Sequence, residues 1–292
     1  MTTNRGFSDV GWLEQQIAIF SAVPPGQGFE DEAEVEKVVN ALLGCLEFGA
    51  ARAAVRDAAG RWSAVPWVKQ GILLGFRIGR VTDMSLGGKS SFRFFDKHLF
   101  PAQPLAQSAG VRVVPGGSTI RRGAHVAKGV VCMPPMFINV GAYVDSGTMV
   151  DSHALVGSCA QIGKRVHLSA AAQIGGVLEP VHAVPVVIED DVFVGGNSGV
   201  YEGTIVRRRA VLASGTILTR ATPVFDLVHE TVHRAEGGHT LEIPEGAVVV
   251  PGARAAGGAW ASEHGLSLYT PVIVKYRDEG TNAATALEQW LR

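Results

Sequence analysis

The chain has few of the features that mark several common classes of protein. Its 292 residues include three cysteines, Cys45, Cys132 and Cys159, and no C-x-x-C pair. An odd number of cysteines without paired spacing favours a reducing compartment over a disulfide-bonded secreted protein. No stretch approaches about 18 uncharged apolar residues, so we expect no transmembrane helix. The first residues, MTTNRGFSDVGW, lack the apolar segment of a secretory signal. Together these absences predict a cytoplasmic protein.

An excess of charge of either sign is also lacking. Lysine and arginine total 26 and aspartate and glutamate total 27, which gives a formal net charge of −1. Proteins that bind nucleic acid or anionic membranes use positive charge to attract phosphate groups. We therefore expect neither nucleic acid nor membrane as a partner. The local basic run Arg207, Arg208 and Arg209 is interpreted as a solvated edge.

Aromatic residues make up only 7% of the chain, whereas glycine occurs 36 times. Against this background, apolar residues recur every six positions in two long series. The series comprise Val114, Ile120, Val126, Cys132, Ile138, Val144, Val150, Val156, Ile162, Leu168 and Ile174, and then Ile188, Val194, Val200, Val206, Leu212 and Leu218. Neither an α-helix, with a period of 3.6, nor a short strand, with a period of two, sustains this spacing. The pattern predicts a hexapeptide repeat folded as a parallel β-helix, with about eighteen residues in each three-sided coil.

Composition and spacing divide the chain into three expected parts. Residues 1–108 are predicted to form an α-rich N-terminal domain, with helices over 31–56 and 67–78. Residues 109–255 are predicted to form the β-helix, and residues 256–292 a small C-terminal segment.

The period is interrupted twice inside the predicted β-helix. Fourteen residues separate Ile174 from Ile188, and Pro180 and Pro185 lie between them, which predicts a loop near 177–187. The remaining expected elements are a second loop near 219–242, a connector over 95–104, a terminal strand over 267–276 and a C-terminal helix over 281–292. Loops that leave a rigid repeat are where functional residues tend to lie.

One short motif suggests a metal site. The segment His229 to His233 reads HETVH and satisfies the zinc-protease pattern H-E-x-x-H, which requires a helix so that both imidazoles share a face. The β-branched pair Thr231 and Val232, and the position between predicted β coils, favour an exposed hairpin instead.

Other potential ligands and nucleophiles also have a simpler interpretation. His125, His153 and His167 lack H-x-x-x-x-H spacing and occupy different hexad positions, so we expect no metal. Cys159 has no basic partner specified by the sequence, and we interpret it as structural.

Two aspartates, Asp145 and Asp151, occupy equivalent positions in successive hexads. Either could be catalytic. Both also fit the turn positions of such coils, where aspartate, asparagine and glycine are favoured for local reasons. The pattern alone does not choose between them.

Long stretches resemble one known family. The runs RVVPGGSTIRRGAHVAKGVVCMPP, INVGAYVDSGTMVDSHALVGSCAQIGKRVHLS and IGGVLEP, and SLYTPVIVK near the C-terminus, closely resemble the tetrahydrodipicolinate N-succinyltransferases. WVKQGILLGFRI and FFDK resemble that family's N-terminal domain. The resemblance implies a homotrimer of left-handed β-helices with active sites between subunits. It also implies succinyl transfer from succinyl-CoA to the amino group of L-2-amino-6-oxopimelate, in lysine and diaminopimelate biosynthesis.

The resemblance also carries over two substrate-binding residues. The Arg of RVVP is Arg112, and the second Asp of YVDxGTMVD is Asp151, which leaves Asp145 as a turn residue. A carboxylate that accepts a proton from the attacking amine fits Asp151, as general base in a direct attack on the thioester. A guanidinium that binds one carboxylate of the dicarboxylate acceptor fits Arg112.

For the CoA donor we expect contacts at coil edges. The candidate CoA-binding residues are Gly175, Gly176, Gly195, Ser214 and Lys275. The backbone N–H groups of Gly175 and Gly176 are also candidates to stabilise a tetrahedral oxyanion.

The sequence departs from the family at several positions. Family members have Glu within GxRSEVVEG, where this chain reads GGNSGVYEG with Gly199, so either Asp151 acts without that Glu or an acid such as Glu202 replaces it. His153 replaces a family Trp, and the tail lacks the usual basic residues. Two alternatives remain open: an acetyl-CoA-dependent N-acetyltransferase on the same or a related amino diacid, and a non-enzymatic β-helix scaffold.

Overall fold

The computed structural model describes residues 10–85, 92–278 and 280. Three helices lie in the N-terminal part: α1 (Val10–Ser21), α2 (Glu32–Phe48) and α3 (Pro66–Ile78). Two small antiparallel pairs accompany them, β1 (Ala54–Arg56) with β2 (Trp62–Ala64), and β3 (Val81–Asp83) with β4 (Phe95–Lys97). A short 3₁₀ helix, η1 (Gln107–Ala109), leads into the repeat.

The helix α2 is shorter than its pattern predicted. It begins where Asp31 caps it by accepting a hydrogen bond from the backbone N–H of Glu34 (3.0 Å), and it ends at Gly49, whose φ of 77° is left-handed. The predicted continuation to residue 56 is wrong, because this cap stops the helix and Ala54–Arg56 pairs as strand β1. The helix predicted over 67–78 is confirmed as α3, and α1 was not predicted.

The repeat forms three parallel sheets, in which each strand but the last of sheet II is two residues long. Sheet I contains β7 (His125–Val126), β10 (Tyr143–Val144), β13 (Gln161–Ile162), β16 (Val187–Ile188), β19 (Ile205–Val206) and β24 (Glu242–Ile243). Sheet II contains β5 (Arg112–Val113), β8 (Val131–Cys132), β11 (Met149–Val150), β14 (His167–Leu168), β17 (Phe193–Val194), β20 (Val211–Leu212) and β25 (Ala247–Ala255). Sheet III contains β6 (Thr119–Ile120), β9 (Phe137–Ile138), β12 (Leu155–Val156), β15 (Gln173–Ile174), β18 (Gly199–Val200) and β21 (Ile217–Leu218).

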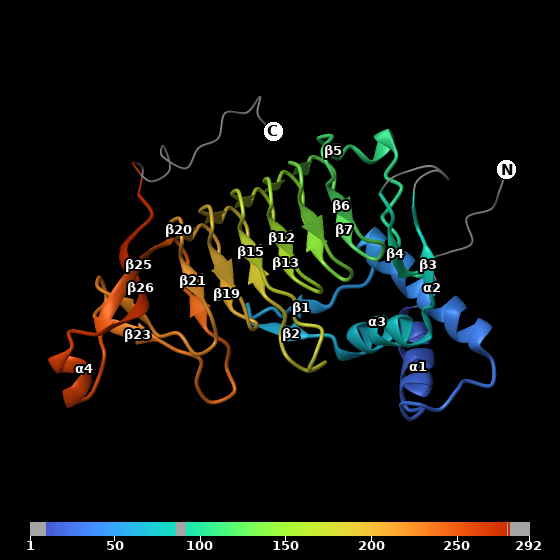
Figure 1. Cartoon of the computed structure of the whole chain (residues 1–292), viewed down its shortest axis with the longest axis horizontal. Helices are drawn as coiled ribbons and strands as arrows, with labels where there is room; N and C mark the ends of the chain where they lie inside the picture. Colours follow the sequence, from blue (N-terminus) through green and yellow to red (C-terminus); the bar gives the residue numbers. More distant parts are fainter. Residues whose placement is uncertain (1–9, 86–91, 279, 281–292) are drawn as a thin grey trace.

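The chain visits the three sheets in turn and, from β6 onwards, returns to each after 18 residues, except where the two loops add residues before β16 and before β24. Tyr143, for example, pairs with His125 before it and with Gln161 after it. Gln161 then pairs with Val187, so the extra residues between these coils leave the ladder intact. The stacked coils extend along the long axis of the molecule, as Figure 1 shows.

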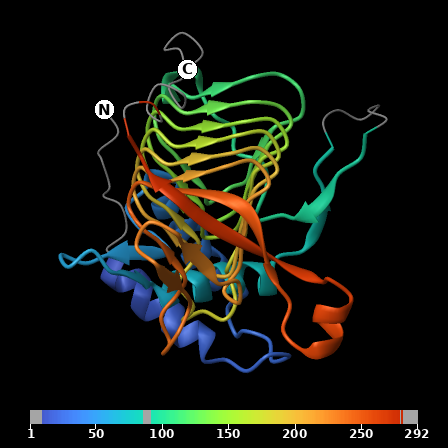
Figure 2. The ribbon, with the colours of Figure 1, turned by 90° about the vertical axis from the view of Figure 1, so that its left-hand side faces the viewer.

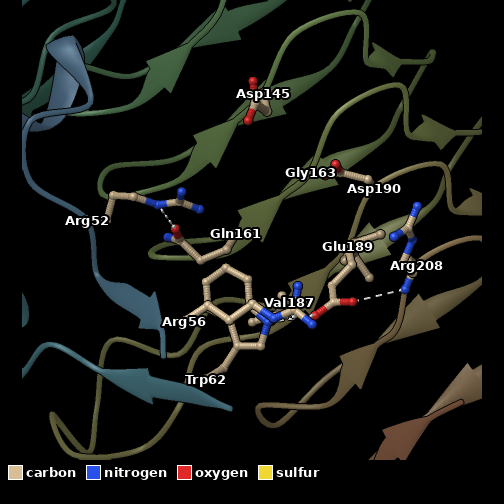
Figure 3. Close-up of a pocket in the computed structure, with 11 residues that line it drawn as sticks. Arg52, Arg56, Trp62, Asp145, Gln161, Gly163, Val187, Glu189, Asp190 and Arg208 are labelled. Carbon is tan, nitrogen blue, oxygen red and sulfur yellow. Dashed lines mark hydrogen bonds and ion pairs between the residues drawn. The ribbon is translucent and has the colours of Figure 1, made fainter. Parts of the chain in front are cut away.

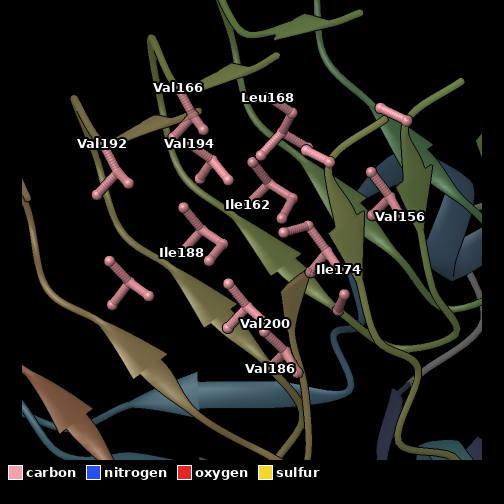
Figure 4. Close-up of a cluster of buried hydrophobic side chains, with 14 of the residues drawn as sticks. Val156, Ile162, Val166, Leu168, Ile174, Val186, Ile188, Val192, Val194 and Val200 are labelled. Carbon is pink, nitrogen blue, oxygen red and sulfur yellow. The ribbon is translucent and has the colours of Figure 1, made fainter. Parts of the chain in front are cut away.

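Aliphatic side chains fill the inside of the coils (Figure 4). Of the seventeen repeat positions, fifteen are buried, and the other two, Val114 and Val126, are half-buried in the first coil. Full burial of an aliphatic side chain stabilises a fold by about 1.5–3 kcal/mol, so this stack dominates the stability of the domain. The fold is therefore mainly β, with parallel strands in a hexapeptide repeat and with helices at the N-terminus.

The three edges between the sheets are the parts that present polar residues. The I–II edge follows each strand of sheet I, the II–III edge follows each strand of sheet II, and the III–I edge follows each strand of sheet III. Along the II–III edge, the backbone N–H groups of Asp151, Ser169 and Gly195 each donate to the coil above, at Leu168, Val194 and Leu212. Each edge is thus a rigid column with one position per coil.

The N-terminal helices and β1–β2 lie along one side of the coil stack in both ribbon views (Figures 1 and 2). The contact is specific. Arg122 Nη1 donates to Asn40 Oδ1 (2.7 Å), and Glu47 Oε1 accepts from the backbone N–H of Gly123 (2.9 Å). The N-terminal part is therefore fixed to the first coils.

The C-terminal part adds an antiparallel ribbon. The strand predicted over 267–276 is confirmed as β26 (Ser267–Tyr276), which pairs with β25, and α4 (Ala259–Glu263) lies between them. The excursion after residue 219 contains a hairpin of β22 (Val224–Asp226) and β23 (Thr231–His233). The helix predicted over 281–292 lies outside the described residues. Over the described ranges, each helix is too short or too polar to cross a bilayer.

Candidate active site

Three of the predicted site residues share one edge of the coil stack. Asp151, Gly195 and Ser214 lie along or next to the II–III edge. The coils approach so closely there that a Cβ on Gly195 would be 2.5 Å from the backbone nitrogen of Ser214. Glycine is thus required at residue 195, which lies two coils beyond Asp151 on the same edge.

Asp151 is half-buried, and its side chain is held in place. Its Oδ1 accepts a hydrogen bond from the backbone N–H of Ser152 (2.7 Å). Asp145 makes the same contact with Ser146 (2.6 Å) but lies on the I–II edge. A separation of six residues is one third of a coil, so the two similar aspartates point to different sides of the molecule.

Arg112 lies on the same sheet as Asp151 but two coils away. Strand β5 places Arg112 opposite Val131, and Val131 pairs in turn with Met149, two residues before Asp151. Two strand spacings amount to about 10 Å. The backbones of Arg112 and Asp151 therefore lie about 10 Å apart along one side of the coil stack.

Gly175 and Gly176 are placed elsewhere. They follow β15 on the III–I edge and line a cavity of about 850 Å³ together with Tyr201, Glu202 and Arg220. A Cβ on Gly176 would be 2.7 Å from the backbone nitrogen of Ser158, so this edge is also tightly stacked. Within one chain, these two glycines are not brought next to Asp151.

Lys275 lies on β26, opposite Val248 of β25. Its side chain is about half exposed and forms an ion pair with Asp278 (3.2 Å). It lies at the C-terminal end of the stack, beyond the coils that carry Asp151.

A buried lysine that was not predicted from the sequence contacts the loop that lines the cavity of about 850 Å³. Lys69 of α3 is fully buried, and its Nζ donates to the backbone carbonyl of Ala183 (2.6 Å) in the loop between β15 and β16. Burial lowers the pKa of this lysine. The signal was a lysine on the apolar face of the helix WVKQGILLGF, a position where a charged residue needs a specific partner.

Comparisons with known proteins identify the family of this chain. Residues 21–78 match a family model described as tetrahydrodipicolinate N-succinyltransferase N-terminal, and residues 185–220 match one described as hexapeptide repeat of succinyl-transferase. The 2,3,4,5-tetrahydropyridine-2,6-dicarboxylate N-succinyltransferase of Bradyrhizobium diazoefficiens is 45% identical over 286 residues, which cover 96% of this chain and 98% of that protein. The chain belongs to the tetrahydrodipicolinate N-succinyltransferase family.

Other relatives agree with this assignment. The protein of the same name from Nitrobacter winogradskyi is 45% identical over 89% of this chain and 90% of its own. A crystal structure of a Campylobacter jejuni 2,3,4,5-tetrahydropyridine-2-carboxylate N-succinyltransferase is similar in fold, with a TM-score of 0.50 at 15% identity over 81% of this chain and 62% of that one. The resemblance deduced from the sequence motifs is thus confirmed.

The departure at Gly199 has a structural counterpart in this family member. The ring of Tyr201 occupies the space beside residue 199: a Cβ on Gly199 would be 2.4 Å from Cε2 and 2.8 Å from the hydroxyl oxygen of Tyr201. Glu202, the acid considered as a replacement, lines the large cavity, and its Oε2 accepts from the backbone N–H of Arg220 (2.9 Å). The ring of Tyr201 can therefore lie here only because residue 199 is a glycine. This relationship was not predicted from the sequence.

The H-E-x-x-H segment is not helical in this succinyltransferase family member. His229 and Glu230 lie in the turn between β22 and β23, as the predicted hairpin requires. His229 Nδ1 lies 2.9 Å from Oδ2 of the buried Asp226, which also accepts a hydrogen bond from the Tyr276 hydroxyl (2.7 Å). No set of three or more His, Cys, Asp or Glu side chains within 10–85, 92–278 and 280 is arranged to hold a metal ion.

Cys159 is fully buried. Burial raises the pKa of its thiol to about 12. The reactive form of a cysteine is the thiolate, so this side chain is unsuited to be a nucleophile at neutral pH. Its interpretation as a structural residue fits this environment.

Proposed function

We propose that the protein transfers the succinyl group of succinyl-CoA to the amino group of L-2-amino-6-oxopimelate, the open form of tetrahydrodipicolinate, in lysine and diaminopimelate biosynthesis. The observation that carries the proposal is the 45% identity, over 96% of the chain, with a relative named for this reaction. The edge that contains Asp151 supplies a carboxylate of the kind the chemistry requires.

Asp151 is the general base in this proposal. The acceptor's ammonium group must lose a proton before its nitrogen can attack, and Asp151 takes that proton as the C–N bond to the thioester carbonyl forms. The tetrahedral intermediate then collapses: its nitrogen gives up a second proton to the departing sulfur, the C–S bond breaks, and CoA leaves as the thiol. The Ser152 N–H holds the carboxylate in place throughout.

Arg112 binds a carboxylate of the acceptor. A guanidinium donates two parallel hydrogen bonds to a carboxylate, which fixes both the position and the orientation of the substrate. The spacing of about 10 Å from Asp151 along sheet II supports a division of labour in which one residue holds an end of the acceptor and the other its amine.

The donor is assigned to the coil edges. Gly195 and Ser214 lie on the II–III edge, two and three coils beyond Asp151, and Gly175 and Gly176 line the cavity of about 850 Å³ on the III–I edge. Lys275 is proposed to contact CoA near the C-terminal end. Because these residues occupy two edges of one chain, we propose a homotrimer in which neighbouring chains bring the edges together.

The remaining expectations are proposed on the same basis. The coils are proposed to wind as a left-handed parallel β-helix over residues 109–255, between an N-terminal domain over 1–108 and a C-terminal segment over 256–292. The similarity of fold to the Campylobacter jejuni structure supports this assignment. A cytoplasmic location suits an enzyme that uses CoA thioesters and carries three free cysteines.

The test compares donors. Thiol release from succinyl-CoA and from acetyl-CoA is measured with the same acceptor, and we expect the higher kcat/KM with succinyl-CoA. Faster acetyl transfer would overturn the choice of donor, and no acceptor-dependent release from either would overturn the proposed reaction. Size-exclusion chromatography coupled to light scattering tests the proposed trimer independently of the activity assay.

A further inference from the structure

A second, smaller cavity lies on the I–II edge, away from the column of Asp151. Its volume is about 180 Å³, and it lies between the β1–β2 pair and the coils of sheet I. Arg52, Asp145 and Asp190 line it, with Trp62 and Gln161 forming part of the wall (Figure 3). A cavity of this size is too small for CoA, since sites for drug-sized molecules span about 300–1,000 Å³.

The charged groups around the cavity have different local partners, and they leave hydrogen-bonding capacity unused. Arg52 Nε donates to Gln161 Oε1 (2.9 Å), and its guanidinium lies over the ring of Tyr143, 3.7 Å from the centroid. Within the part of the chain that the structure describes, the two Nη groups of Arg52 pair with neither Asp145 nor Asp190. Both Nη groups remain able to donate into the cavity.

Each of the two aspartates uses one carboxylate oxygen to accept a hydrogen bond from the backbone. Asp145 Oδ1 accepts from the N–H of Ser146 (2.6 Å), and Asp190 Oδ1 accepts from the N–H of Lys164 (2.9 Å). These backbone contacts orient each carboxylate and leave its second oxygen available. Gly163 makes room for this arrangement, because a Cβ there would be 2.4 Å from Asp190 Oδ1.

The third acid of the cavity is already satisfied. Glu189 is buried and accepts from Trp62 Nε1 (2.9 Å), Arg207 Nη1 (2.9 Å) and the backbone N–H of Arg208 (3.0 Å). Its charge is therefore already paired within the protein, and it forms part of the cavity wall. Two further guanidinium groups of the lining also have acidic partners, since Arg56 lies 3.5 Å from Glu189 and Arg208 lies 3.4 Å from Glu245. The groups that remain for a ligand are the guanidinium of Arg52 and the two carboxylates.

We propose that this cavity binds a small zwitterion, an α-amino acid, whose carboxylate pairs with Arg52 and whose ammonium group pairs with Asp145 and Asp190. A guanidinium matches a carboxylate through two parallel hydrogen bonds, and an ammonium group supplies donors that two carboxylates can accept. The ring of Trp62 and the side chain of Val187, which both line the cavity, supply apolar walls for the side chain. The ligand would contact both β1–β2 and sheet I, and so would fix the N-terminal part to the coils.

This site is separate from the proposed reaction. Asp145 and Asp151 point to different sides of the stack, so a ligand bound at Asp145 does not occupy the edge of Asp151. The inference therefore stands whether or not the proposed reaction is correct.

The test measures binding to the full-length protein by calorimetry and by the rise in Tm that a ligand of the native state produces. The probes are L-alanine, a zwitterion, and L-lysine, which carries a side-chain ammonium in addition, with propionate and ethylammonium as analogues that each carry a single charge. We expect millimolar or tighter binding of at least one amino acid and none of either analogue. Equal binding of propionate and L-alanine would replace the proposal with a simple anion site, and no binding of any probe would overturn it.

Two variants assign the contacts. Asp145→Asn keeps an oxygen for the Ser146 N–H but removes the charge, and Arg52→Gln removes the guanidinium; each is expected to weaken amino-acid binding by about tenfold or more. Asp57→Asn is the matched control, because Asp57 lies in the turn of the same β1–β2 pair but outside this cavity. Should Arg52→Gln fail to fold, as judged by circular dichroism, Asp145→Asn alone decides, and unchanged binding in that variant would refute the site.

Discussion

The ring of Tyr201 lies across Gly199 so closely that a methyl group on residue 199 would overlap it, with 2.4 Å between the added carbon and Cε2. We therefore expect Gly199→Ala to lower the free energy of unfolding by about 1–3 kcal/mol, the usual cost of overpacking. The measurement is urea-induced unfolding of the parent and the variant.

Tyr201→Ala provides the control for this overlap. In the Tyr201→Ala background, Gly199→Ala should cost little, because the ring it meets is gone, and the two changes should show a coupling energy of similar size. Additive effects of the two changes would mean that Tyr201 moves aside freely.

Asp151→Asn tests the general base. The amide cannot accept a proton, so we expect kcat to fall by about 10²–10⁴ while the fold stays intact. Thiol release at saturating substrate measures it. Turnover within about threefold of the parent would exclude Asp151 as the base. Asp31→Asn is a suitable control, since an asparagine at this N-cap still accepts the Glu34 N–H.

Lys69 predicts a pH dependence of stability. Burial lowers the pKa of Lys69 in the folded protein below its ordinary value of 10.5, so the unfolded chain binds more protons between these two values. Stability therefore rises with pH across that window. We expect the parent to gain Tm relative to Lys69→Met as the pH is raised from 7 towards 10.

The comparison with Lys69→Met removes the contributions of other titrating groups. Lys37→Met, on the exposed face of α2, controls for the loss of a lysine as such. A parent-minus-variant difference that stays flat or falls with pH would contradict the assignment of a buried ammonium group.

Tyr276→Phe tests the cluster that ties the β22–β23 hairpin to β26. Burial alone would raise the pKa of Asp226, but hydrogen bonds from the Tyr276 hydroxyl, from His229 Nδ1 and from two backbone N–H groups outweigh it and hold the pKa well below its usual range. Loss of the tyrosine hydroxyl should cost about 1.5–3 kcal/mol at pH 7, because one partner is charged.

The sign of the pH effect follows from the same shift. A depressed carboxyl pKa stabilises the folded state above the unfolded value near 4, and that stabilisation is lost as the pH falls through the folded value. The difference between the parent and Tyr276→Phe should therefore shrink in strong acid. A constant difference down to low pH would argue against a charged Asp226.

Much of the fold follows from spacing alone. The period of six places Val144, Ile162 and Ile188 in one ladder of sheet I, even though the loop before Ile188 breaks the count. The reason is that a flat face two strand residues long can bury one aliphatic side chain per hexad, so each inward position is physically determined.

Other elements have weaker signals. Helix α1 buries only Leu13 and Ile17 and has no acidic residue in its first turn. Its sequence therefore has neither a long apolar periodicity nor a charge signal that would mark a helix. The strand β1 appears where α2 was expected to continue, because the left-handed cap at Gly49 overrides the apolar spacing beyond it. Local patterns do not reveal where a single glycine will adopt a positive φ.

The candidate site was only partly accessible from the sequence. Asp145 and Asp151 are indistinguishable as turn residues, and the family resemblance was needed to choose between them. The contact of Lys69 with Ala183 depends on how two distant segments of the chain meet. The overlap at Gly199 depends on where the ring of Tyr201 points. Neither can be deduced from a periodic pattern in the sequence.

The 18-residue register makes the molecule a linear array of nearly equivalent units, each in contact only with the unit before and after it. Removing one whole unit between Asp151 and Gly195 would shorten the array and keep every later residue on its original side. Removing six residues would instead rotate everything downstream by a third of a turn, which would carry Gly195 and Ser214 away from Asp151. Over evolutionary time, such an enzyme can change length in whole units, whereas its angular phase must be conserved.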